Sequence, residues 1–196
     1  MSSTLSTMLP LGTRAPEFSL PDVVSGKIIS LDTFKTKKAL LVMFICRHCP
    51  YVKHVQHEIA RIGRDYASKS VGIVAITSND AAQFPEDSAA SSAEMAKELG
   101  FTFPFCYDES QEVAKAYKAA CTPEFYVFDA SRRLVYRGQL DDSRPSHDTP
   151  VTGKNLRAAL DAVLADAPVD QNQIPSIGCS IKWKPPTTST LSHKTP

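Results

Sequence analysis

The pattern of apolar positions between residues 39 and 77 predicts the centre of the fold. Residues 40–45 form an unbroken apolar run that is too short for a globular helix and does not alternate, which predicts a strand buried on both faces. The next segment carries apolar residues at intervals of three and four with charged residues between them, which predicts an amphipathic helix. Residues 71–77 form a second apolar, β-branched strand, so the three elements predict a right-handed βαβ unit.

Shorter patterns extend this unit in both directions. Residues 15–22 and 26–31 are two short alternating runs separated by turn residues, which is typical of a β-hairpin. The order of strands and helices places the chain in the α/β class. The other expected elements are helices over 93–99 and 110–118, an extended segment over 103–107, paired strands over 120–129 and 134–138, and a closing helix over 153–165.

Length and composition predict one domain between two tails. A chain of 196 residues, 42% of them hydrophobic, can bury one good core. Residues 1–14 are polar and rich in serine and threonine, so we expect a flexible N-terminal tail followed by a domain over residues 15–166. Residues 167–196 are rich in proline, serine and threonine and are expected to form a C-terminal tail, interrupted by a segment around Cys179 and Trp183.

Charge and hydropathy exclude several classes of partner. The formal net charge is +1 and no long basic run occurs, which argues against nucleic acid and an anionic membrane surface. The first fifteen residues lack the basic and apolar regions of an export signal, and no apolar run approaches the roughly 18 residues of a membrane span. We therefore expect a cytoplasmic protein. Five cysteines, an odd number, fit reduced or cycling thiols better than a disulfide framework.

Cys46 and Cys49 are the candidate chemical groups, because they lie where the predicted central strand meets its helix. Unpaired backbone N–H groups and the helix dipole stabilise a thiolate at such a position. Arg47 and His48 add positive charge between the two sulfurs, which also lowers a thiol pKa. Pro50 suits the first turn of a helix. The C-x-x-C spacing is that of a dithiol that can close to a disulfide.

Four strings of the sequence carry a resemblance to a known family. They are C-R-H-C-P-Y-V-K-H, C-T-P-E-F-Y-V-F-D, Y-R-G-Q-L-D-D-S-R-P and G-C-S-I-K-W-K, and the opening A-P-E-F-S-L-P-D resembles the N-terminal hairpin of peroxiredoxins. Over residues 15–165 the order of elements resembles the thioredoxin fold, and the strings resemble its peroxiredoxin-like group. The resemblance implies a thioredoxin fold with an N-terminal β-hairpin extension and an extended C-terminal tail.

The same resemblance implies a thiol–disulfide oxidoreductase, in redox homeostasis or antioxidant defence, that uses no cofactor. Cys46 would attack from the exposed edge of the turn, and Cys49 would resolve the mixed disulfide. Thr122 and Pro123 would form the cis-proline loop, which offers backbone groups to an incoming peptide. The partners would be protein or small-molecule disulfides and a thiol electron donor. His48 resembles the C-x-H-C of disulfide isomerases, so the direction of the reaction is open.

Departures from the family pattern keep two other functions open. A thiol-dependent peroxidase is the first, since Cys49 lies at the position of the peroxidatic cysteine. Against it, Cys46 replaces a threonine of that pattern, and Arg47 or Arg137 would have to supply the missing arginine. A Cu(I)- or Zn-binding protein is the second, because thiolates suit both metals and copper chaperones share the fold. The histidine spacing fits no standard site, and we assign no metal ligand.

Three further cysteines and one glutamate are weaker candidates. Cys106 is expected to be a buried apolar thiol. Cys121 precedes the Thr-Pro loop, where core packing is favoured over a role as a third thiol. Cys179 is either a third thiol that reaches the dithiol from the tail or part of a segment that packs on the surface. Glu124 is expected to be a surface carboxylate.

Overall fold

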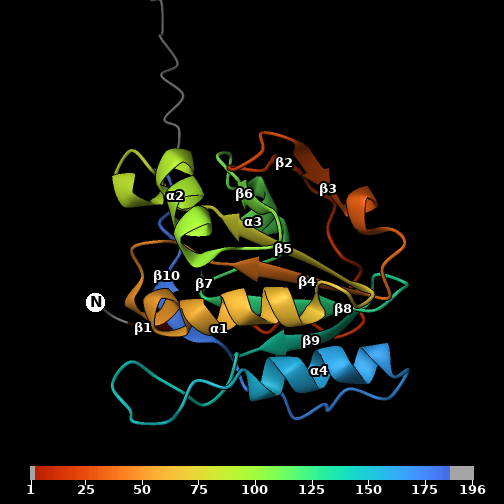
Figure 1. Ribbon diagram of the computed structural model, residues 1–196. Helices are drawn as coiled ribbons and strands as arrows, with labels where there is room; N and C mark the ends of the chain where they lie inside the picture. Colours follow the sequence, from red (N-terminus) through yellow and green to blue (C-terminus); the bar gives the residue numbers. More distant parts are fainter. Residues whose placement is uncertain (1–2, 186–196) are drawn as a thin grey trace, which may run out of the picture.

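A five-stranded sheet runs through the centre of the computed structural model, which describes residues 3–185 (Figure 1). The strand order is β6-β5-β4-β8-β9. These strands are β4 (Ala39–Phe44), β5 (Val71–Thr77), β6 (Phe105–Tyr107), β8 (Glu124–Phe128) and β9 (Leu134–Gly138). β4 pairs in parallel with β5 and antiparallel with β8, which in turn pairs antiparallel with β9. The predicted βαβ unit and the later hairpin are therefore confirmed.

Helices and a hairpin cover the two faces of this sheet. The first face packs against α1 (Pro50–Tyr66), α2 (Ala89–Leu99) and α4 (Lys154–Leu164), and the second against the hairpin β2 (Ser19–Pro21) and β3 (Ile28–Ser30), the 3-10 turn η1 (Leu31–Phe34) and α3 (Glu112–Ala116). The apolar run in β4 is unbroken because both faces of this strand are buried. Leu41 and Met43 belong to the core cluster on the first face, and Leu40 and Val42 belong to the cluster on the second.

A second sheet joins segments from both ends of the chain. It contains β1 (Ser3–Leu5), β10 (Ile177–Ser180) and β7 (Cys121–Thr122), in the antiparallel order β1-β10-β7. The prediction of a flexible N-terminal tail is wrong over residues 3–5, because the backbone of this segment pairs with β10. The C-terminal segment is likewise held by strand pairing around Cys179. The part of that prediction over 186–196 lies outside the described residues.

Helix boundaries differ from expectation in two places. α2 begins at Ala89, four residues before the predicted start at residue 93. Ser88 caps the helix by accepting a hydrogen bond from the Ser91 N–H at 3.3 Å. α3 begins after Gln111 and is shorter than predicted. Gly100 ends α2 in the left-handed conformation, with φ 63°, as its position predicted. Within the described residues, every helix is too short or too polar to cross a membrane.

Candidate active site

The thiols of Cys46 and Cys49 meet at a single residue, Thr122. Cys46 lies two residues after the end of β4, and Cys49 is the N-cap of α1. The Cys46 Sγ lies 3.2 Å from Thr122 Oγ1, and the Cys49 Sγ lies 3.1 Å from the Thr122 carbonyl oxygen. The peptide bond between Thr122 and Pro123 is cis, as the resemblance implied. The structure thus brings together the two candidate thiols and the candidate substrate loop.

Neither thiol of this pair is exposed. The residues Cys46 and Cys49 are each 0% exposed. The expectation that Cys46 lies at an exposed edge is wrong, because the Thr122 hydroxyl and the His48 ring lie 3.2 Å and 3.9 Å from its sulfur. Cys106 is also buried, within the core cluster on the second face of the sheet, as expected. A substrate disulfide can therefore reach the pair only after a local movement.

The two thiols shift each other's pKa in opposite directions. A hydrogen bond from the Cys46 thiol lowers the pKa of Cys49 to about 5 against the effect of burial, and the Cys179 thiol and the Val52 N–H act in the same direction. The Thr122 side chain also lowers the pKa of Cys49, while the Thr122 carbonyl, 3.1 Å from the sulfur, accepts a hydrogen bond from the protonated thiol. The pKa of Cys46 is raised, mainly by the same hydrogen bond to Cys49 and secondly by burial. Cys49 is thus the first of the pair to ionise, at a helix N-terminus that favours negative charge.

Asp87 orients the histidine between the two cysteines. His48 Nδ1 hydrogen-bonds to Asp87 Oδ2, and Asn79 Nδ2 donates to the same oxygen at 2.8 Å. The backbone N–H groups of Arg47 and His48 donate to Asp87 Oδ1 at 2.9 Å and 3.1 Å. The hydrogen bond to Asp87 raises the pKa of His48, and the charge of Cys49 adds to it. Asp87 could not be recognised from the sequence, because it lies in a polar stretch whose burial depends on the fold.

The two arginines considered for the site contact other groups. Arg47 Nη1 pairs with Glu94 at 2.9 Å, and Arg47 Nη2 pairs with Glu98 at 3.0 Å. Both glutamates belong to α2. Arg137 Nη1 donates to a glutamine side chain at 2.7 Å. The Arg47 guanidinium therefore binds carboxylates instead of lying over the sulfurs, and the imidazole of His48 is the basic group in contact with the cysteine pair.

One group of potential metal ligands occurs at this site. Cys46, His48 and Asp87 place a sulfur, a ring nitrogen and a carboxylate oxygen within 4.8 Å of one another. These residues do not fit a metal, because the Asp87 carboxylate already accepts four hydrogen bonds, which occupy the lone pairs of both oxygens. The His48 nitrogen nearest the sulfur is engaged by that same carboxylate.

Glu124 is buried, contrary to the expectation of a surface carboxylate. It is 1% exposed because the turn before Pro123 folds its backbone N–H groups onto the side chain. Oε2 accepts hydrogen bonds from the Ala120 and Cys121 N–H groups at 2.8 Å and 3.2 Å, and Oε1 accepts one from the Tyr126 hydroxyl at 2.6 Å. Burial raises the pKa of Glu124 despite these donors. The Cys121 Sγ lies 3.8 Å from Glu124 Oε2, and burial, followed by the Glu124 charge, raises the pKa of Cys121.

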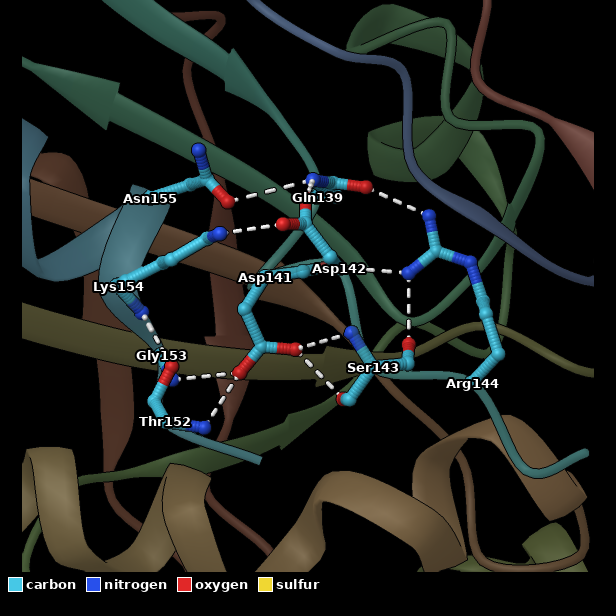
Figure 2. A network of polar contacts seen from close by, with 9 residues as sticks. All are labelled: Gln139, Asp141, Asp142, Ser143, Arg144, Thr152, Gly153, Lys154 and Asn155. Atoms are coloured by element: carbon cyan, nitrogen blue, oxygen red, sulfur yellow. Dashed lines mark hydrogen bonds and ion pairs between the residues drawn. The ribbon is translucent and has the colours of Figure 1, made fainter. Parts of the chain in front are cut away.

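Pro123 also lines a pocket, and the loop between β9 and α4 forms one of its walls. Arg144 and Ile177 are among the residues that line it. Figure 2 shows how Asp141 fastens this loop, since its carboxylate accepts hydrogen bonds from two neighbouring segments. The donors are Ser143 N, Ser143 Oγ, Thr152 N and Gly153 N. Burial opposes ionisation, but these donors lower the pKa of Asp141.

Cys179 lies directly opposite Thr122 in the pairing of β10 with β7. It is 4% exposed and belongs to the same core cluster as Cys46 and Cys49. The pKa of Cys179 is raised to about 12, mainly by burial and secondly by a hydrogen bond to Cys49. Nearby on the same segment, Ile181 is buried in the core cluster on the second face, whereas Trp183 is 41% exposed.

Comparison with known proteins identifies the family. A family model described as Redoxin matches residues 10–156. The chain belongs to the Redoxin family. The crystal structure of an uncharacterized conserved protein from Geobacillus kaustophilus is similar to it, with 58% identity, a TM-score of 0.93, and coverage of 94% of this chain and 98% of that one. A hypothetical protein from Sinorhizobium meliloti is 49% identical, with a TM-score of 0.91 and coverage of 92% and 98%. Among curated proteins, none matches this chain.

This Redoxin-family chain also shares its fold with a more distant protein. The thioredoxin domain of a thiol-disulfide oxidoreductase from Bacteroides vulgatus has a TM-score of 0.56 at 18% identity, over 66% of this chain and 88% of that one. A likeness at this identity concerns the fold, and the predicted thioredoxin-like fold is confirmed. Family and fold together support a thioredoxin-like redox function.

Proposed function

We propose that the protein is a thiol–disulfide oxidoreductase whose redox-active pair is Cys46 and Cys49. The observation that supports this most directly is that each sulfur lies within 3.2 Å of an oxygen of Thr122, the residue before cis Pro123. Two cysteines at a helix N-terminus can interconvert between dithiol and disulfide by thiol–disulfide exchange. The proposed step draws only on these sulfurs, on a substrate disulfide and on an external thiol.

The proposed reaction moves two electrons from the dithiol to the substrate. A protein thiolate attacks one sulfur of the substrate disulfide, a mixed disulfide forms, and the other substrate sulfur leaves as a thiolate. The second cysteine then attacks the protein sulfur of the mixed disulfide, which closes the Cys46–Cys49 bond and releases the second substrate thiol. An external thiol donor restores the dithiol. The reverse sequence would oxidise a substrate dithiol.

The lowered pKa of Cys49 supports this residue as the attacking thiolate. The family resemblance implies Cys46 instead, but the pKa of Cys46 is raised, and burial does not distinguish the two residues because both are 0% exposed. His48 stabilises a thiolate on either cysteine, because the Cys49 charge contributes to its raised pKa and its ring lies 3.9 Å from the Cys46 sulfur.

Reduction of insulin by dithiothreitol tests the proposal. We expect Cys49→Ser to lower the catalysed rate by roughly 100-fold or more, since it removes the proposed attacking sulfur, and Cys46→Ser to lower the rate by a smaller factor, since it removes the proposed resolving sulfur. Cys106→Ser is the matched control and should keep the wild-type rate, because this thiol lies in the opposite core cluster. Full activity in both dithiol variants would overturn the proposal. Consumption of peroxide without reduction of insulin would favour a thiol-dependent peroxidase.

A further inference from the structure

β10 pairs with the short strand that leads into the cis proline. Cys179 lies opposite Thr122 and Ser180 opposite Cys121, in antiparallel register. Gly178 makes this close approach possible, because a Cβ atom at this position would lie 1.9 Å from the Thr122 carbonyl oxygen. The edge that could offer backbone groups to an incoming peptide is therefore occupied by a strand of the same chain.

The register also determines where the Cys179 side chain points. Residues that lie directly opposite each other in an antiparallel pair carry their side chains on the same face, with Cβ atoms about 4.5–5.5 Å apart. The Thr122 hydroxyl on that face lies 3.2 Å from the Cys46 Sγ. Cys179 therefore faces the dithiol, and its thiol is one of the groups that lower the pKa of Cys49. Cys46, Cys49 and Cys179 all belong to one buried core cluster.

Contacts at the end of β10 connect it to the histidine of the site. The Ile181 N–H donates to the Ala120 carbonyl at 3.1 Å, and the Lys182 N–H donates to Asn79 Oδ1 at 2.8 Å. The Asn79 side chain in turn donates to Asp87, the carboxylate that binds His48. Docking of β10 and orientation of His48 therefore share one hydrogen-bond network.

We propose that β10 is a built-in occupant of the peptide-binding edge and that Cys179 is a third redox-active thiol, which forms a disulfide with Cys49. The proposal rests on the proposed function, because it concerns the same dithiol. It predicts that β10 must leave Thr122 before a protein disulfide can pair there.

The proposed step is an internal thiol–disulfide exchange. Starting from the Cys46–Cys49 disulfide, the Cys179 thiolate attacks the Cys49 sulfur, the Cys49–Cys179 bond forms, and Cys46 leaves as a thiolate that takes up the proton lost by Cys179. No electron leaves the protein. Part of the raised pKa of Cys179 comes from its hydrogen bond to Cys49, and that contribution disappears when Cys49 is in a disulfide.

Disulfide mapping in the full chain tests the thiol pairing. We expect Cys46→Ser, oxidised with glutathione disulfide and digested under non-reducing conditions, to yield a Cys49–Cys179 peptide pair from monomeric protein. Adding Cys179→Ser should abolish this pair and leave glutathione on Cys49. Adding Cys121→Ser instead is the matched control and should preserve the pair, because Cys121 contacts Glu124.

This readout is independent of turnover. If Cys46→Ser gives only glutathione adducts or intermolecular disulfides, the pairing is wrong even where insulin reduction by the wild type succeeds. If the Cys49–Cys179 pair forms but insulin is not reduced, the pairing stands and the proposed function fails.

The variant Gly178→Ala leaves every cysteine in place and tests whether β10 closes the site. The added Cβ would collide with the Thr122 carbonyl, so β10 must shift. We expect a bulky maleimide to modify Cys46 and Cys49 at least about 10-fold faster than in the wild type, as for a segment with lowered local stability. Ser180→Ala, on the same strand, is the control and should leave the rate unchanged. Equal rates in a Gly178→Ala protein whose thermal unfolding shows an intact core would overturn the closure.

Discussion

Asp87 and Glu124 are two buried carboxylates whose ionisation the fold drives in opposite directions. They are 0% and 1% exposed. Asp87 lies beside the cysteine turn, where burial would raise its pKa, but hydrogen bonds from His48 and Asn79 lower it. Glu124 follows the cis proline, and burial raises its pKa even though backbone N–H groups and the Tyr126 hydroxyl donate to it.

The difference shows that burial alone does not decide the charge of a carboxylate. All the donors to Glu124 are neutral, whereas Asp87 binds an imidazole that becomes a cation when protonated. Asp87 therefore favours the protonated form of His48, whose ring lies 3.9 Å from the Cys46 sulfur. Glu124 instead fastens the turn that presents Thr122.

The largest effect in this comparison is expected for Asp87→Asn. Either orientation of the new amide turns its NH2 group toward present donors, which are two backbone N–H groups on one side and His48 and Asn79 on the other. We expect the free energy of unfolding to fall by roughly 2–3 kcal/mol, as for hydrogen bonds to a charged group. The pKa of His48 should fall toward its ordinary value. Urea denaturation and NMR titration measure the two effects, and an unchanged His48 pKa would contradict the assignment.

A smaller effect with opposite signs is expected in the pH dependence of stability. The folded pKa of Asp87 is lowered, so its contribution is present above the unfolded pKa and is lost as the pH falls through the folded value. The folded pKa of Glu124 is raised, so its contribution is present below the unfolded pKa and is lost as the pH rises through the folded value.

Urea denaturation at a series of pH values separates these two contributions. Asp87→Asn should reduce the loss of stability on acidification, and Glu124→Gln should reduce the loss that accompanies ionisation of Glu124 at higher pH. The wild type supplies the reference curve. If the free energy of unfolding changed with pH in the same way in all three proteins, the two carboxylates would not differ as proposed.

The smallest effect is expected for Glu124→Gln. The amide oxygen can keep the two backbone N–H donors, while the new NH2 group donates to the Tyr126 hydroxyl, whose own hydrogen can turn to the Tyr117 carbonyl 3.3 Å away. We expect the free energy of unfolding to change by less than about 1 kcal/mol, since no buried donor loses its partner. The urea midpoint measures this change. If Glu124→Gln lowered the free energy of unfolding as much as Asp87→Asn does, the proposed difference between the two carboxylates would be wrong.

Local patterns predicted the regular elements best. β5 and β9 have the bounds expected from their apolar runs, and α1 begins at the C-x-x-C turn where the apolar stripe starts. The cis bond before Pro123 followed from a family motif. In contrast, α2 began early, because a serine cap and a short polar stretch gave a weaker signal than an apolar run.

The surroundings of the site could not be predicted in the same way. The burial of Cys46 depends on Thr122 and His48, and the burial of Asp87 depends on donors from the cysteine turn. A polar residue in a polar stretch has the same local pattern whether it lies in solvent or accepts four hydrogen bonds inside the protein. Glu124 was wrongly expected at the surface for this reason.

The sequence by itself determined the order of strands and helices, the βαβ unit and a cysteine pair at the start of α1, because each depends on the spacing of residues close together in the chain. Only the tertiary structure decided that Cys179 meets Cys49, that Asp87 holds His48, and that β10 covers the edge beside Pro123. These contacts join segments far apart in the chain, and their geometry follows from strand register and from the pairing of buried polar groups.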